Sequence, residues 1–223
     1  MCRILVFQAN KKQKPLKYLK AFAQMCQQSK KWQGDGWGIY YHNQAQSNWV
    51  LFNSVKSIWL DQACFHKIPA SNFFLVHARG ASFQKHKYCL NFNQPFNKQK
   101  IIFAFNGFLN NVSLPYKVPG NIGSKKIFNL FLKFKHELKS SKKALEQLIK
   151  ALLTNTRLIE ALNLAIYDQK NLYLYTRFLS DPAYFQLKQF QNRDQTIICS
   201  EPILNLTFKP IPQDQIIKLS LKS

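Results

Sequence analysis

The order of the hydrophobic segments constrains the fold of this 223-residue chain more than any other feature. Short blocks rich in aromatic and β-branched residues dominate the first half, two segments with helical spacing follow, and strand-like blocks return after Asn163. Strands with one apolar face and helices with one apolar stripe must bury those surfaces against each other. This order predicts an α+β fold, for which two sheets sandwiched between helices is the favoured arrangement among other α+β arrangements, and we expect one domain over residues 1–223.

Hydrophobic spacing and turn residues locate the individual elements. Pro15 can open a helix, and apolar residues then recur at helical spacing up to Cys26. Early strands are predicted at residues 2–7, 38–41, 49–52, 73–78 and 101–105. The last four are expected to form one sheet, covered by two amphipathic helices around residues 127–134 and 145–152. Later strands are predicted at residues 164–167, 172–176, 196–199 and 216–221, with a hairpin turn at residues 168–171.

The charge balance is strongly basic, with 32 Lys and Arg against 10 Asp and Glu and a net charge of +22. Such a charge attracts nucleic acid, anionic lipid or an acidic partner. Only five of the basic residues are Arg, the residue best suited to bidentate readout, and the Lys residues are scattered. We interpret the charge as a solvated surface, with nucleic-acid binding as the alternative. The apolar runs are too short to cross a bilayer, so we expect a soluble cytoplasmic protein without membrane contact.

Five cysteines without a CxxC pair suggest neither a disulfide framework nor a zinc site, and the sequence predicts no metal and no cofactor. Cys2 is chemically special. Loss of Met1 would give this residue a free α-amine, whose pKa of about 8 suits it to take the thiol proton and return it to a leaving group. By position alone, however, an ordinary buried cysteine at the start of a strand is the favoured interpretation of Cys2.

Other segments carry candidate site residues. Gly36 and Trp37 lie in a glycine-rich turn at residues 34–38 that lets backbone approach a ligand or a strand closely. Arg79 places a permanent cation at the end of a predicted strand, and His77 lies two residues earlier on the same face, where we expect it to be a structural support. An Asn-Gly pair is in general a turn signal, and residues 106–107 follow the strand at 101–105.

Several segments in this order resemble the class II glutamine amidotransferases of the N-terminal-nucleophile hydrolase superfamily, and among them the short stand-alone branch of γ-glutamyl amidohydrolases. The resembling segments are residues 1–3 (Met-Cys-Arg), 34–39 (Gly-Asp-Gly-Trp-Gly-Ile), 77–82 (His-Ala-Arg-Gly-Ala-Ser), 94–96 (Gln-Pro-Phe), 103–107 (Phe-Ala-Phe-Asn-Gly) and 199–202 (Cys-Ser-Glu-Pro). The tail at residues 211–212 and 216–219 is also similar, so the resemblance covers nearly the whole chain.

The resemblance implies a four-layer αββα sandwich and a site. Cys2 is its nucleophile, and the side-chain amide of Asn106 with the backbone N–H of Gly107 forms the oxyanion hole. Arg79 binds the α-carboxylate of the substrate with help from Ser82. The remaining residues placed by the resemblance around the substrate are Gly36, Trp37 and His77. The Ser-Glu-Pro segment at 200–202 is given no chemical role.

The chain departs from the family where the substrate's amine is bound. Related sequences carry Gly-x-Thr-Asp-Ser-Glu before a helix, and an acidic residue of this stretch meets the substrate's ammonium group. Here Gly123 replaces the Asp and Lys125 replaces the Glu. Free glutamine should therefore bind poorly, because its ammonium group loses a counter-charge and meets Lys125. We expect either a γ-glutamyl donor with a modified amine or a decayed catalyst. Near residues 94–96, Phe92 replaces the usual Asn.

Three functions remain open. The first is hydrolysis of a small-molecule γ-glutamyl amide by attack of Cys2, acyl-enzyme formation and deacylation by water. The second is a catalytically decayed basic binding protein on the same fold, which predicts that the Lys residues form one continuous stripe. The third is a subunit that supplies ammonia to a separate synthase, a partner that the sequence does not identify.

Overall fold

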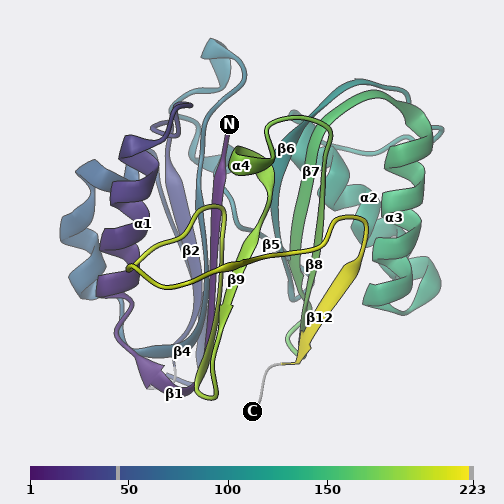
Figure 1. Cartoon of the computed structure of the whole chain (residues 1–223). Helices are drawn as coiled ribbons and strands as arrows, with labels where there is room; N and C mark the ends of the chain where they lie inside the picture. The colour runs from purple at the N-terminus through teal and green to yellow at the C-terminus, as the bar shows by residue number, and fades with distance from the viewer. Residues whose placement is uncertain (44–45, 221–223) are drawn as a thin grey trace.

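The computed structural model describes residues 1–43 and 46–220 and consists of four layers, with helices outside two facing sheets (Figure 1). This confirms the predicted α+β sandwich. Within the described residues, one sheet has seven strands in the order β11-β9-β10-β1-β4-β2-β3, and the other has five in the order β12-β8-β7-β6-β5. All strand pairs are antiparallel.

The strands of the first sheet are β1 (Arg3–Gln13), β2 (Trp37–Asn43), β3 (Asn48–Ser54), β4 (Ser71–Ala78), β9 (Lys188–Gln191), β10 (Gln195–Cys199) and β11 (Lys209–Pro210). Those of the second sheet are β5 (Phe96–Lys98), β6 (Ile101–Val112), β7 (Thr156–Tyr167), β8 (Asn171–Phe178) and β12 (Ile216–Ser220). The α-helices are α1 (Leu16–Gln28), α2 (Gly123–Leu138), α3 (Ser141–Asn155) and α4 (Pro182–Phe185). Short 3-10 helices are η1 (Ile58–Leu60), η2 (Gln62–Lys67), η3 (Gln84–His86) and η4 (Leu90–Phe92).

Two sequence expectations need correction. Residues 101–105 do not join strands β2, β3 and β4, because β6 pairs with β5 and β7 in the second sheet. Helices α2 and α3 accordingly pack on the second sheet and not on the first. The hairpin at residues 168–171 is confirmed, since Tyr167 pairs with Leu172 across it. The strand predicted at 216–221 is β12, and Leu221 lies outside the described residues.

Three apolar layers hold the sandwich together. Helix α1 and the first sheet bury one of them, which contains Phe22, Trp37 and Ile39. Helices α2 and α3 bury another against the second sheet, and the third lies between the two sheets. Each layer removes apolar area from water, which is the main favourable term in folding. None of the helices in the described part of the chain is long and apolar enough to cross a membrane.

The pleat of the strands decides which side chains enter the layer between the sheets. Successive side chains of a strand point to opposite faces, so every second residue of β1, β4 and β6 faces this layer. Its apolar members from these three strands are Ile4, Val6, Phe73, Leu75, Ile102 and Ala104. By the same alternation, Cys2, His77 and Asn106 follow these residues along β1, β4 and β6 on the face towards this layer. Polar and nucleophilic groups from both sheets therefore share one end of the layer, the end at which Figure 1 places the N-terminus.

Candidate active site

Cys2 lies at the mouth of a cavity, directly before β1. Its side chain is partly buried, and the thiol donates to the carbonyl of Gly80 at an Sγ···O distance of 3.8 Å. A Cβ at Gly80 would lie 2.3 Å from the Trp32 carbonyl oxygen and 2.5 Å from the Met1 nitrogen. A side chain at position 80 would displace the N-terminal segment, so the glycine allows Cys2 to reach the cavity.

His77 is the buried neighbour of the Cys2 thiol. The ring lies on β4 with its Nε2 atom 3.2 Å from the carbonyl oxygen of Phe105. Because a carbonyl oxygen only accepts, Nε2 carries the proton of this hydrogen bond. Nδ1 is buried and has no hydrogen-bond partner among the described residues, and the His77 side chain interacts with the Cys2 thiol. His77 is thus oriented from the second sheet and able to exchange a proton with the thiol.

The pKa of the Cys2 thiol is lowered. Burial raises its pKa, but the charge and hydrogen bond of His77, the N-terminal ammonium group and the Gly80 backbone outweigh burial and lower it to about 6. Burial raises the pKa of Cys26, Cys64 and Cys199, in the last case to about 12. Near neutral pH, Cys2 is therefore largely a thiolate while these three cysteines remain protonated.

We predict that alkylation of Cys2 by iodoacetamide has a half-maximal rate near pH 6. Only the thiolate reacts, and a lowered pKa means that this form is present above about pH 6 and is lost below it. A His77→Asn variant should shift the midpoint upward, because it removes the charge that stabilises the thiolate. Mass-resolved rates at Cys2 over a pH range of about 4 to 9 would measure both midpoints. Equal midpoints in the two proteins would contradict this account.

Asn106 and Gly107 lie in the middle of β6 and not at its end. The strand continues to Val112, and Asn106 and Gly107 pair with Asn163 and Leu162 of β7. The Asn106 side chain is fully buried, yet neither its nitrogen nor its oxygen has a hydrogen-bond partner in the described structure. An unpaired buried amide costs about 1 to 3 kcal/mol. Gly107 lines the same cavity as Cys2.

Gln94 fixes the strand next to these residues, a role that the sequence did not reveal. Its side-chain Oε1 accepts from the backbone N–H of Phe105, and its Nε2 donates to the Phe105 carbonyl at 3.3 Å. These are the contacts that a neighbouring strand would make at this position. By alternation, the Gly107 N–H points to the same edge of β6 as that of Phe105, away from β7 and along the cavity. Gln94 belongs to the resembling segment at residues 94–96, but nothing in the sequence assigns a role to this side chain.

Arg79 and Ser82 line the cavity opposite β6. The Arg79 guanidinium is nearly buried, donating from Nη2 to the carbonyl of His86 at 2.6 Å and from Nη1 to the Asp35 carbonyl at 3.3 Å. Burial lowers the Arg79 pKa, whereas the nearby Cys2 and Asp35 charges raise it. Asp35 also accepts from the backbone N–H of Ala81 at 2.7 Å, which fixes the turn after β4. Hydrogen bonds therefore fix the Arg79 guanidinium as a positive charge in the cavity wall.

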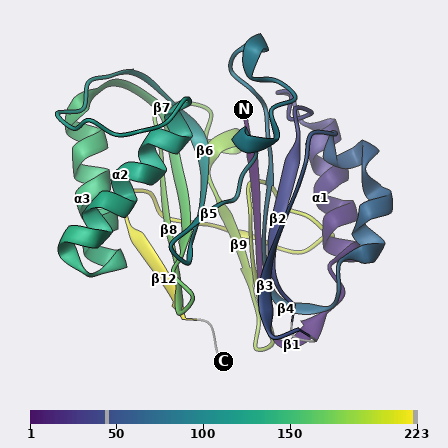
Figure 2. The same cartoon turned by 180° about the vertical axis from the view of Figure 1, so that it is seen from behind.

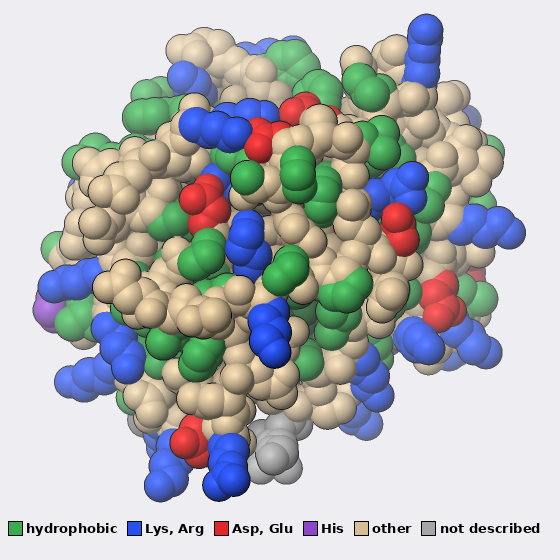
Figure 3. Space-filling view, in the orientation of Figure 1, with side chains coloured by type: hydrophobic (Ala, Val, Ile, Leu, Met, Phe, Trp, Pro, Cys, Tyr) green, Lys and Arg blue, Asp and Glu red, His purple; other side chains and the backbone are tan. Residues whose placement is uncertain are grey.

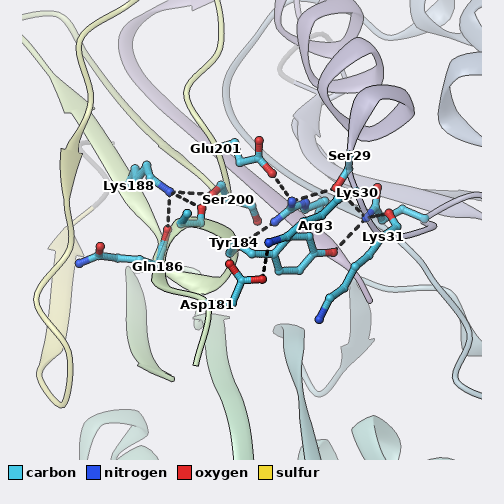
Figure 4. Close-up of polar contacts among 12 residues, drawn as sticks. Arg3, Ser29, Lys30, Lys31, Asp181, Tyr184, Gln186, Lys188, Ser200 and Glu201 are labelled. Carbon is cyan, nitrogen blue, oxygen red and sulfur yellow. Dashed lines mark hydrogen bonds and ion pairs between the residues drawn. The ribbon is translucent and has the colours of Figure 1, made fainter. Parts of the chain in front are cut away.

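A buried network around Arg3 anchors the residue next to Cys2 (Figure 4). Arg3 donates to the carbonyl of Tyr184 at 2.8 Å and to Ser29 Oγ at 2.9 Å, and it forms an ion pair with Glu201. The guanidinium carbon lies 3.6 Å from the centre of the Tyr184 ring, a cation–π contact. Ser200 adds a hydrogen bond from the N–H of Ile4 to its Oγ at 2.9 Å. The 200–202 segment therefore supports the start of β1.

Comparison with known proteins now bears on this geometry. The family model described as "Glutamine amidotransferases class-II" matches residues 1–193. The chain belongs to the class II glutamine amidotransferase family. No curated protein sequence matches it.

Solved structures place this class II amidotransferase chain in the same fold. Glutamine phosphoribosylpyrophosphate amidotransferase from B. subtilis, complexed with ADP and GMP, matches with a TM-score of 0.68 at 14% identity, over 98% of this chain and 47% of that one. A class II domain protein from Silicibacter pomeroyi (TM-score 0.62, 15% identity) and a predicted glutamine amidotransferase from Pseudomonas aeruginosa (TM-score 0.56, 17% identity) match over 100% of both chains. The chain thus spans about half of the first enzyme and the full length of the other two.

Two residues that the amidotransferase resemblance placed at the substrate lie elsewhere. Trp37 is fully buried on the helix-facing side of β2, where its Nε1 donates to Asp61 at 3.0 Å, because the pleat turns odd residues of β2 away from the cavity. Gly36 has a φ of +125° and its carbonyl accepts from the N–H of Arg79 at 2.8 Å. Gly36 thus positions Arg79 and does not line the cavity.

The expected clash of the substrate amine with Lys125 also needs correction. The Lys125 ammonium group lies 5.6 Å and 5.8 Å from the ring centres of Phe92 and Phe96, in a neighbouring cavity. Lys126 lines the main cavity together with Gly123 and Ser124. Residues three apart share a face of a helix, so Lys126, and not Lys125, stands beside Gly123.

Proposed function

We propose that this amidotransferase-family chain is an amidohydrolase that cleaves a γ-glutamyl amide through a Cys2 thioester. The observation that carries the proposal is the acidic Cys2 thiol beside the oriented ring of His77, at the mouth of a cavity that Gly107 and Arg79 also line. A thiolate at neutral pH is the reactive form of such a nucleophile.

In the proposed reaction, the Cys2 thiolate attacks the amide carbon and forms the Sγ–C bond. The tetrahedral oxyanion accepts hydrogen bonds from the Asn106 amide and the Gly107 N–H, and the unpaired state of the Asn106 amide supports this role. Collapse breaks the C–N bond as the leaving amine takes a proton. Water then hydrolyses the thioester and regenerates the thiol.

Two groups can move the proton in this proposal. One is the α-amine of Cys2, which exists only after removal of Met1. The other is His77, whose side chain interacts with the thiol and does not depend on removal of Met1. The α-amine has the pKa of a good base near neutrality, while His77 stabilises the thiolate from which attack begins.

The charge distribution on one face of the molecule gives no support to nucleic-acid binding. On the face in Figure 3, the Lys and Arg side chains are spread across the surface with neutral and apolar groups between them, and they do not gather into one stripe. Nucleic-acid sites concentrate positive charge along a continuous path.

The proposal is tested by intact mass spectrometry after treatment with a diazo-ketone glutamine analogue. We expect one adduct per chain in the wild type and in Cys64→Ala, and none in Cys2→Ala. The same spectra give the state of Met1. An adduct that persists in Cys2→Ala, or no release of ammonia from any γ-glutamyl amide by a protein whose Cys2 is labelled, would rule out the proposed reaction.

A further inference from the structure

The cavity at Cys2 extends far beyond the nucleophile into an apolar groove. Its volume is about 610 Å³, within the range of about 300 to 1,000 Å³ that holds drug-sized ligands. The groove wall comes from the end of β6, the segment after it and the start of α2, and its apolar members include Leu109, Val112, Leu114, Tyr116, Val118 and Ile122. Figure 2 shows the connection from β6 to α2 running across the same end of the molecule as the N-terminus. A single amino acid would leave this groove empty.

Charge in the cavity opposes a free ammonium group. Among the described residues that line it, none is Asp or Glu, whereas Arg79 and Lys126 are basic. The first turn of α2 also lacks an acidic residue, and its N-terminus is the positive end of the helix dipole. An ammonium group placed at the start of α2 would lose its water without gaining a carboxylate counter-charge. A carboxylate, in contrast, would find Arg79.

The position of Gly123 leaves room for a substituent on the substrate. A Cβ built on this residue meets no atom within 4 Å, so the space in front of the first residue of α2 is open. The apolar side chains of Ile122 and Ile127 flank it in the cavity wall. The site therefore provides apolar volume beside the helix end, where a charged amine would be least stable.

The free edge of β6 offers hydrogen bonds along the same groove. Strand β5 pairs with β6 only at residues Ile101 to Phe103. The side chain of Gln94 makes hydrogen bonds with the backbone of Phe105. Beyond Phe105, no described strand pairs with the outer edge of β6. By alternation from Phe105, the backbone groups of Gly107 point to that edge, and Gly107 lines the cavity. An extended amide can pair with such an edge while its side groups fill the adjacent pockets.

We propose that the acyl donor is a glutamine derivative whose α-amine is capped by an apolar acyl group. Its α-carboxylate lies on Arg79, the cap amide pairs with the edge of β6, and the apolar chain occupies the groove towards Tyr116. The inference rests on the proposed function. Attack of Cys2 on the side-chain carboxamide releases ammonia, and water then releases the Nα-acylglutamate, so that one water is consumed for each ammonia formed.

Titration calorimetry with the full-length Cys2→Ala protein tests binding apart from chemistry. The probes are glutamine, Nα-acetylglutamine, Nα-octanoylglutamine and Nα-acetyl-leucylglutamine. We expect the two larger caps to bind at least about 50-fold more tightly than glutamine, from the apolar area that they bury. Acetyl alone should give only part of this gain. Tighter binding of the octanoyl compound identifies a fatty acyl cap, and tighter binding of the leucyl compound identifies a peptidyl cap; either result supports the proposal.

A charge placed at Gly123 tests the specificity. Gly123→Asp should raise kcat/KM for glutamine by about 10-fold or more and lower it for the octanoyl compound, because the carboxylate pairs with an ammonium group and fills the space of the cap. In Gly123→Asn, the new side chain has nearly the same volume as Asp but no charge. This variant should lower kcat/KM for the octanoyl compound and leave kcat/KM for glutamine unchanged. The open space at Gly123 and the favourable position of an acid in the first helical turn predict that both variants fold.

The outcomes separate this inference from the hydrolase proposal. Glutamine binding as tightly as the capped compounds would overturn the inference, while ammonia release would still test the hydrolase. Tight binding of a capped compound that no enzyme preparation hydrolyses would uphold the ligand class and overturn the hydrolase. An equal rise of kcat/KM for glutamine in Gly123→Asn and Gly123→Asp would also overturn the inference, because charge would then play no part in the choice of substrate.

Discussion

Replacing Asn106 with valine is expected to reduce kcat for amide hydrolysis by about 100- to 1,000-fold without lowering the free energy of unfolding. The side-chain amide has no partner in the described structure, so valine removes no protein hydrogen bond and ends the cost of burying an unpaired amide. Valine has a similar volume and favours a strand. Ammonia release and denaturant unfolding would measure the two effects.

Asn163 provides the matched control, since it is the partner of Asn106 across the β6–β7 ladder. Its side chain donates to the Phe185 carbonyl at 2.8 Å and accepts from Thr176 at 2.5 Å. Asn163→Val should therefore lower the free energy of unfolding by about 1 to 3 kcal/mol, because it leaves buried partners unpaired. If Asn106→Val destabilised the protein as much, or kept its activity, Asn106 would be an ordinary structural residue.

Replacing Arg3 with methionine is expected to lower the free energy of unfolding by about 3 kcal/mol. Methionine fills a similar space but leaves Glu201, Ser29 and the Tyr184 carbonyl without their common donor. The variant should also slow alkylation of Cys2, because the start of β1 loses its anchor. Denaturant unfolding and the alkylation rate are the measurements.

Arg177→Met is the control for Arg3. Its ion pair with Asp214 spans 2.8 Å, but both side chains are about a third to a half exposed. Exposed ion pairs contribute less than about 1 kcal/mol to stability. The free energy of unfolding of this variant should therefore fall only slightly, and the alkylation rate of Cys2 should not change. Equal losses in the two variants would show that burial of Arg3 is not what makes its network important.

The sequence predicted the layers well because hydrophobic period and element order determine which surfaces must be buried. It did not assign β6 to the second sheet, because local patterns carry no information on which strand pairs with which. It also ended that strand at Asn106, where an Asn-Gly pair has the local signature of a turn but pairing with β7 keeps the chain extended.

The candidate site was predictable where strand alternation could be applied. Cys2, His77, Arg79 and Asn106 share the parity of the apolar residues between the sheets, whereas Trp37 has the parity of the helix-facing row. Helical spacing would likewise have placed Lys126 and not Lys125 beside Gly123. The role of Gln94 could not be predicted, because it depends on a contact between its side chain and a strand that the fold brings together.

In the proposed mechanism, the nucleophile and its proton partner come from one sheet, and the oxyanion donors come from the other. Their separation is then set by the thickness of the apolar layer, in which Ala104 and Ala165 of the second sheet face Ile4 and Val6 of the first. A larger side chain deep in this layer would act as a wedge and draw the two halves of the site apart without touching either. The apolar layer between the sheets thus sets the distance from the nucleophile to the oxyanion donors, and kcat would change with the thickness of this layer.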